Sequence, residues 1–92
     1  MIRSFGSNKT QRFAQGRRVP AFEGFRPAAE RRLQALDAAP SLEALAGIPG
    51  HRLEALKGDR KGQHSIRIND QWRLCFVWKD GDAYDAEIVD YH

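Results

Sequence analysis

The chain has 92 residues, of which 41% are hydrophobic and 29% charged, with a formal net charge of +3. This composition fits one small domain spanning residues 1–92 and excludes a second domain. Because so small a domain buries only a modest fraction of its surface, we expect a partner subunit to contribute to its stability.

The first half of the chain has the residue pattern of helices. Residues 2–5 predict a short opening strand, and Ser7 is the expected N-cap of a brief helix that runs through Phe13 and ends at Gly16. A longer helix follows, with Pro27 in its first turn and Ala39-Pro40 at its end. Its apolar positions recur at helical spacing: Ala29, Leu33 and Leu36.

Ser41 then caps a short helical segment over residues 42–46, closed by Gly47. After residue 50 the hydrophobic period changes to two, which is typical of strands. We expect strands over residues 52–56, 64–69, 72–79 and 83–89, separated by turns at 58–62, 69–70 and 80–81. Such short connections predict antiparallel neighbours, so the fold class is α+β with helices segregated to one side of the sheet.

Residues 72–79 alternate cleanly between two faces. Trp72, Phe76 and Trp78 lie on one face, and we predict that they are core residues rather than platforms for base stacking. The opposite face carries Arg73 and is the expected working face of the sheet.

The one cysteine, Cys75, excludes an intramolecular disulfide and a cysteine zinc site, which favours a reducing compartment. No apolar run reaches the length of a membrane span, and the start lacks the pattern of a signal peptide. We therefore predict a cytoplasmic protein with no membrane partner.

Charge is distributed unevenly along the chain. Residues 1–36 carry 8 Lys+Arg against 2 Asp+Glu, and residues 51–73 carry 6 against 3, whereas residues 74–92 carry 1 against 5. Basic segments of this kind favour a surface that faces a polyanion. On charge alone, an ordinary solvated basic surface is equally consistent.

The residues suited to chemistry gather in the second half of the chain. His51 and His64 lack the spacing of a metalloprotease pair, and Cys75 is expected to be a small core residue rather than a nucleophile. We therefore predict no metal and no cofactor. The remaining cations, histidines, tyrosine and carboxylates suit the cleavage of RNA through its own 2′-hydroxyl, which needs a base, an acid and a cation for the phosphate.

Each candidate also has a structural interpretation. These are a frayed terminus (His92), a strand end (Asp90, Tyr91), exposed strand positions (Arg67, Arg73) and a charged hairpin loop with glycines at its turns (Lys57–Gly62). Only the joint pattern favours the nuclease hypothesis.

The sequence also resembles a known family. Residues 49–76 and the terminal run 87–92 are similar to the HigB toxins of the RelE/ParE superfamily, as are residues 1–5 and 32–39. The resemblance implies a RelE-like fold with two N-terminal helices packed on a mainly antiparallel sheet. It also implies a metal-free, ribosome-dependent mRNA endoribonuclease that inhibits translation, acts on the 70S ribosome and its mRNA, and is neutralised by a HigA-type helix-turn-helix antitoxin.

Carried over by position, the resemblance implies that Asp90, Tyr91 and His92 are active-site residues, with Lys57 and Arg73 on the same surface. We predict a catalytic group that consists of Asp90, Tyr91, His92, Lys57 and Glu54. We predict that the group that binds RNA or phosphate is Arg73, Arg67, Arg60, Lys61 and Gln71.

Glu54 departs from the family pattern, because better-studied members carry a histidine there. His51 is no simple replacement, since an offset of three along a strand turns its side chain to the opposite face. Two hypotheses stay open: Glu54 is the base, or Asp90 and His92 carry the proton transfers. A carboxylate beside the phosphate path repels RNA unless it is paired with Lys57 or a nearby arginine.

Two other functions share this fold. Glu54 favours a non-catalytic inhibitor or one directed at DNA gyrase, as in ParE-type relatives. A plain module that docks on RNA or the ribosome is the third hypothesis, and its affinity for RNA would fall steeply with salt. Whichever holds, the resemblance favours an antitoxin bound on the helical side, with the active surface left open.

Overall fold

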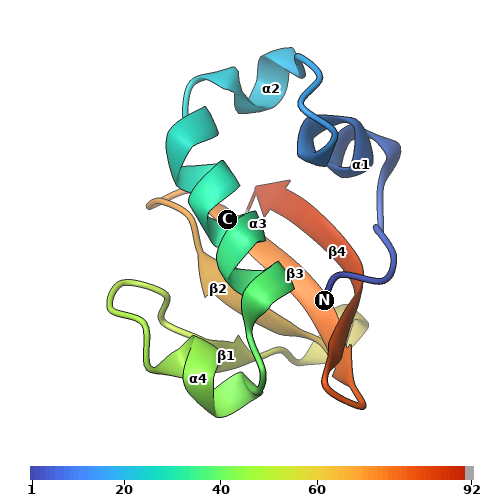
Figure 1. Ribbon diagram of the computed structural model, residues 1–92, viewed down its shortest axis with the longest axis vertical. Helices are drawn as coiled ribbons and strands as arrows, with labels where there is room; N and C mark the ends of the chain where they lie inside the picture. The colour runs from blue at the N-terminus through green and yellow to red at the C-terminus, as the bar shows by residue number, and fades with distance from the viewer. Residues whose placement is uncertain (91–92) are drawn as a thin grey trace.

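The computed structural model describes residues 1–90, which have the α+β fold class that the sequence predicts (Figure 1). Its elements, in chain order, are α1 (Asn8–Ala14), α2 (Pro20–Glu23), α3 (Arg26–Ala38), α4 (Leu42–Ala46), β1 (Glu54–Ala55), the 3-10 helix η1 (Gly58–Arg60), β2 (His64–Arg67), β3 (Trp72–Lys79) and β4 (Asp82–Asp90). The strands form a four-stranded sheet in the order β1-β2-β3-β4, with every neighbouring pair antiparallel.

The helices cover one face of the sheet. In Figure 1, α3 lies across the sheet, α1 and α2 lie together at one end, and α4 lies at the other end beside β1. α1 and α3 are the two N-terminal helices that the family resemblance implied. The expected helix over residues 42–46 is also present, with the Ser41 hydroxyl accepting a hydrogen bond from the Ala44 amide at 3.1 Å.

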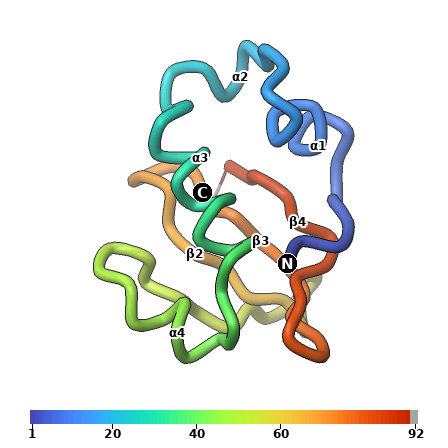
Figure 2. The backbone as a smooth tube through the Cα atoms, in the orientation of Figure 1, coloured from blue at the N-terminus to red at the C-terminus, as the bar shows by residue number. Residues whose placement is uncertain are grey.

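The prediction of an opening strand over residues 2–5 was wrong. The segment instead runs beside β4, as the tube in Figure 2 shows, and forms two isolated parallel bridges, Ile2 with Ala83 and Phe5 with Ala86. The backbones approach closely at Gly6, where an added Cβ would lie 2.9 Å from the Asp85 carbonyl oxygen. The segment therefore protects the outer edge of β4 from pairing with another chain.

α1 is fixed to the sheet by a buried hydroxyl. Ser7 caps the helix by accepting a hydrogen bond from the Thr10 amide at 3.2 Å, as the sequence predicts. The Thr10 side chain is fully buried, and its hydroxyl accepts a hydrogen bond from the Ile88 amide at 3.0 Å. This contact ties α1 to the half of β4 that leads to Asp90.

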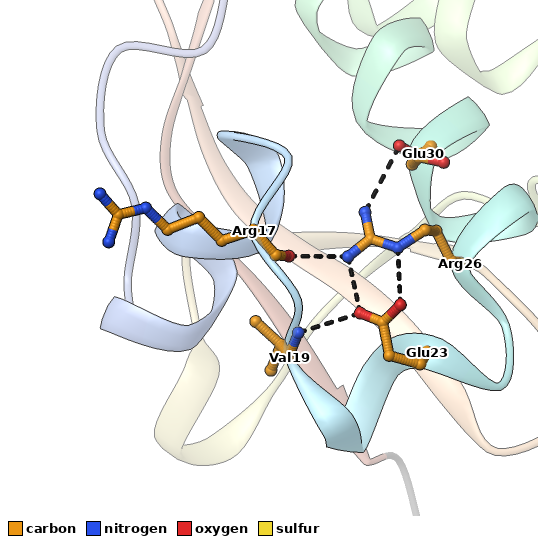
Figure 3. Close-up of polar contacts among 5 residues, drawn as sticks. All are labelled: Arg17, Val19, Glu23, Arg26 and Glu30. Atoms are coloured by element: carbon orange, nitrogen blue, oxygen red, sulfur yellow. Dashed lines mark hydrogen bonds and ion pairs between the residues drawn. The ribbon is translucent and has the colours of Figure 1, made fainter.

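α2 is one helical turn that the sequence analysis missed, and a polar network holds it against α3 (Figure 3). The Arg26 guanidinium donates to both carboxylate oxygens of Glu23, at 2.9 and 2.6 Å, and to the Arg17 carbonyl at 2.7 Å. Glu23 also accepts a hydrogen bond from the Val19 amide at 2.9 Å. These contacts, with the Arg26 side-chain bond first among them, lower the pKa of Glu23 from 4.5 to about 2.

The strands agree with the predicted alternation, with shifted ends. β3 has the expected bounds, whereas β1 begins at Glu54 instead of residue 52 because Arg52 has a φ of +45°, outside the extended region. β2 ends at Arg67 because Asn69 starts a turn in which its side-chain oxygen accepts from the Gln71 and Trp72 amides.

The core lies between the helices and the predicted apolar face of β3. Phe76 is fully buried, and Trp72 packs edge-on against Phe22 and tilted against Phe25, with ring centroids 5.6 and 5.1 Å apart. The prediction that these aromatic residues belong to the core is therefore confirmed. They leave the opposite face of β3 for the site.

Candidate functional site

The candidate site lies on the sheet face opposite the helices. Register places one residue from each strand in a row across this face: Glu54 on β1, Ser65 on β2, Cys75 on β3 and Glu87 on β4. Paired residues of antiparallel strands share a face, so these side chains neighbour one another. Ser65 and Cys75, in the middle of the row, are fully buried.

The loop between β1 and β2 covers the centre of this row. Arg60 reaches from η1 to Glu87 on β4, with 3.3 Å between the guanidinium nitrogen and the carboxylate oxygen. It also donates to the Gln63 side-chain oxygen at 3.0 Å. Cys75 lies beneath these groups, and burial raises the pKa of its thiol, as expected for a core residue rather than a nucleophile.

Arg73 is the best-anchored cation of the site. Its Nε donates to the Ser65 hydroxyl at 2.7 Å, and its Nη2 donates to the Arg52 carbonyl at 2.7 Å and to the Ser65 carbonyl at 3.3 Å. The side chain is only 11% exposed, so the alternative that Arg73 is merely an exposed strand residue is wrong. Its Nε also lies 3.6 Å from a carboxylate oxygen of Glu54.

Glu54 is thus paired with Arg73. Such a pairing with a lysine or arginine is required, because an unpaired carboxylate beside the phosphate path repels RNA. Its side chain is 46% exposed and borders the surface above Arg73. We define the charged cluster as Glu54, Arg60, Arg73 and Glu87, whose formal charges cancel. Lys57 and Lys61, in the loop beside the cluster, are exposed.

A second group of candidates lies at the end of the sheet where β2 and β3 turn. Arg67 pairs with Arg73 in register and so shares its face, while its guanidinium contacts Asp70. Gln71 donates a hydrogen bond to the Asp90 carboxylate at 2.9 Å.

Asp90 on β4 pairs with Trp72 on β3, so the Asp90 side chain lies on the opposite face of the sheet from Arg73. Register therefore unites Glu54, Arg67 and Arg73 on one face and separates Asp90 from them. Tyr91 and His92, the remaining predicted catalytic residues, lie outside the described residues.

His51 takes no part in the charged cluster. It is buried, and its Nδ1 lies 3.0 Å from the Leu45 carbonyl oxygen, on the helical side. Burial lowers the pKa of the His51 imidazole. This placement confirms that His51 does not replace the residue at position 54.

Sequence reasoning missed Ser65 and the Arg52 carbonyl. A signal for Ser65 existed, because the alternation of β2 places a small hydroxyl on the same face as Arg73, where burial demands a hydrogen-bond partner. No signal in the sequence marks the backbone of Arg52.

Within residues 1–90, no cluster of three or more histidine, cysteine or acidic side chains is arranged to hold a metal ion. No helix in this part of the chain is long and apolar enough to cross a membrane.

Solved structures share the fold at low sequence identity. YafQ from Escherichia coli strain BL21(DE3) matches with a TM-score of 0.62 and 14% identity, covering 98% of this chain and 91% of YafQ. The YoeB–YefM complex from Staphylococcus aureus matches with a TM-score of 0.62 and 20% identity, covering 100% of this chain and 98% of the matched chain. At these identities the likeness concerns the fold alone.

Curated relatives share more of the sequence over part of its length. Toxin HigB-1 of Vibrio cholerae serotype O1 is 51% identical over 56 residues, which are 61% of this chain and 59% of the relative. Endoribonuclease HigB of Proteus vulgaris is 43% identical over 61 residues, which are 66% of this chain and 65% of the relative. The aligned segments thus span less than two thirds of these two proteins.

The family described as "RelE-like toxin of type II toxin-antitoxin system HigB" matches residues 4–92, nearly the whole chain. This match agrees with the α+β fold and with the resemblance found in the sequence. The chain therefore belongs to the HigB-like family of RelE-like toxins of type II toxin–antitoxin systems.

Proposed function

We propose that this chain is a ribosome-dependent, metal-free mRNA endoribonuclease that inhibits translation in the cytoplasm. The observation that carries the proposal is the anchored Arg73, whose guanidinium lies on the sheet face opposite the helices, which Arg67 shares. Arginine suits phosphate because its planar fork of donors matches the phosphate oxygens. A relative aligned over 66% of this chain bears the name Endoribonuclease HigB, which supports the same activity.

The proposed reaction uses the RNA's own nucleophile. A base removes the proton of the 2′-hydroxyl, the 2′-oxygen attacks the adjacent phosphorus, and the bond to the 5′-oxygen breaks as an acid protonates that oxygen. The products are a 2′,3′-cyclic phosphate and a 5′-hydroxyl. Arg73 and Lys57 stabilise the charge that develops on the phosphate. Arg60, Arg67, Lys61 and Gln71 hold the flanking RNA.

We assign the proton transfers to Tyr91 and His92. Register places Asp90 on the opposite sheet face from Arg73, so we give Asp90 a positioning role through its hydrogen bond with Gln71. Glu54 has another role. The Glu54 carboxylate faces the Arg73 guanidinium at 3.6 Å, which suits a counter-ion better than a base. In the absence of RNA it offsets the positive charge of Arg73.

The proposed partner is a HigA-type helix-turn-helix antitoxin bound on the helical side. A cavity of about 310 Å³ lies there, between the N-terminal segment, α1 and α3. Its lining is Ile2, Phe5, Phe13, Ala14, Gly16, Glu30, Leu33, Gln34 and Asp37. The apolar side chains and the two carboxylates of this lining suit an apolar segment that carries a lysine or arginine. Such a partner leaves the charged cluster open.

A second candidate function is non-catalytic or gyrase-directed inhibition. It is favoured by one observation, the Glu54–Arg73 pair at the position where the family places a histidine. A gyrase poison would cause DNA damage signalling while transcripts stay intact.

The experiment that tests the proposal is a cleavage assay on messenger RNA with and without programmed ribosomes, followed by mapping of the cut ends. We expect cuts only with ribosomes, and we expect their loss in Arg73→Ala and His92→Ala. Intact transcripts under both conditions would reject the nuclease and favour the second candidate.

A further inference from the structure

The buried hydroxyl of Ser65 has no role in the catalytic scheme above. The side chain is fully buried in the middle of the sheet, on the face that carries Arg73. A buried hydroxyl needs a partner, and this one accepts the Nε–H of Arg73 at 2.7 Å, the geometry of a good hydrogen bond.

Arg73 is also held from a second side. Its Nη2 donates to the carbonyl of Arg52 at 2.7 Å. Arg52 has a φ of +45°, a left-handed conformation that costs energy in a residue with a side chain. The strained residue thus lies two positions before β1, where its carbonyl oxygen accepts a hydrogen bond from the guanidinium.

Together these contacts fix the guanidinium at both its Nε and its Nη2. Ser65 belongs to β2 and pairs with Glu54 on β1 and Cys75 on β3, so the sheet on both sides holds its position. A long arginine side chain otherwise loses rotamer freedom when it binds a phosphate. In this chain the Arg73 side chain has already lost that freedom before RNA binds, so the entropic cost of binding the phosphate is lower.

We propose that Ser65 is a positioning residue: its hydroxyl, with the Arg52 carbonyl, pre-orients Arg73 for the scissile phosphate of RNA. This inference rests on the proposed nuclease function and deepens it. Ser65 itself does not contact RNA and acts through Arg73.

The test measures ribosome-dependent kcat/KM in Ser65→Ala. Because Arg73→Ala is expected to lose cleavage, the double-mutant cycle of Ser65→Ala and Arg73→Ala is measured as affinity for a non-cleavable 2′-O-methyl RNA. Losing a hydrogen bond to a charged group is expected to lower kcat/KM about tenfold in Ser65→Ala. The same substitution in the Arg73→Ala background is expected to change nothing further, because its effect passes through Arg73. Ser65→Thr, which keeps the hydroxyl, should restore activity.

Cys75→Ala is the matched control, since Cys75 is the cross-strand partner of Ser65 and is equally buried. It should lower the melting temperature and leave kcat/KM unchanged. Equal activity of Ser65→Ala and the wild type, or equal losses from Ser65→Ala in both backgrounds, would overturn the proposal.

Two readouts separate this inference from the nuclease proposal. The Nε–H signal of Arg73, assigned with Arg73→Ala, should exchange slowly with water in the wild type and rapidly in Ser65→Ala. Affinity for a non-cleavable 2′-O-methyl RNA should fall roughly threefold or more in Ser65→Ala. If the wild type cleaves nothing yet shows both differences, the nuclease proposal fails and the positioning of Arg73 stands. Rapid exchange in the wild type would overturn the positioning.

Discussion

Removing the charge of Glu54 is expected to strengthen RNA binding without abolishing cleavage. The carboxylate lies 3.6 Å from Arg73, so a phosphate held by that guanidinium would lie about 5 Å from the carboxylate. Glu54 is 46% exposed, so the effective dielectric is close to that of water, and the repulsion at this distance is about 1 kcal/mol. Glu54→Gln should therefore raise the affinity about fivefold.

The assay is fluorescence anisotropy with 2′-O-methyl RNA at low and at high salt. Glu43→Gln is the matched control, because it changes the net charge by the same amount at an exposed position of α4. The gain in Glu54→Gln should exceed that of the control and should shrink as salt is added. An unchanged or weaker affinity would refute the counter-ion role. Loss of cleavage with unchanged affinity would make Glu54 the base instead.

Three further predictions concern stability and the partner. Thr10→Val leaves the buried Ile88 amide without its acceptor and should lower the free energy of unfolding by about 1–3 kcal/mol in a urea titration. Thr10→Ser keeps the hydroxyl and should lower the free energy of unfolding by less. Equal stability of Thr10→Val and the wild type would contradict the anchoring of α1. The folded pKa of Glu23 lies below its ordinary value of 4.5, at about 2, so its stabilising effect is present above pH 4.5 and disappears as the pH falls through about 2. The difference in urea midpoint between the wild type and Glu23→Gln should therefore be constant well above pH 4.5, shrink as the pH falls below 4.5 and disappear below about pH 2. A difference that does not shrink between pH 4.5 and about 2 would refute this. Glu30 lines the helical-side cavity, so Glu30→Lys should weaken antitoxin binding about tenfold in calorimetry and spare cleavage. Glu43→Lys, the control, should change neither antitoxin binding nor cleavage. Unchanged antitoxin affinity in Glu30→Lys would exclude this cavity as the interface.

Local sequence signals predicted most of the fold. The bounds of β3 and α4 follow from period-two alternation and from a serine cap closed by glycine, both of which act within a few residues. The parallel bridges of residues 2 and 5 were beyond such reasoning, because their partners lie about eighty residues away. α2 was missed because four residues are too few to show a helical period.

The sequence predicted which residue types form the site, but it predicted only part of their arrangement in space. Alternation placed Arg73 on the face away from the helices, and the structure confirms this. The contacts that define its role depend on register between strands and on the unusual backbone of Arg52, neither of which a residue type reveals. Register likewise separates Asp90 from the face of Arg73.

The most direct test of the central claim compares the wild type and Arg73→Ala on messenger RNA, with programmed ribosomes and without them, by mapping of the cut ends. The account predicts cuts that require both the ribosome and Arg73. Cuts that persist in Arg73→Ala, or intact transcripts with the wild type, would contradict it.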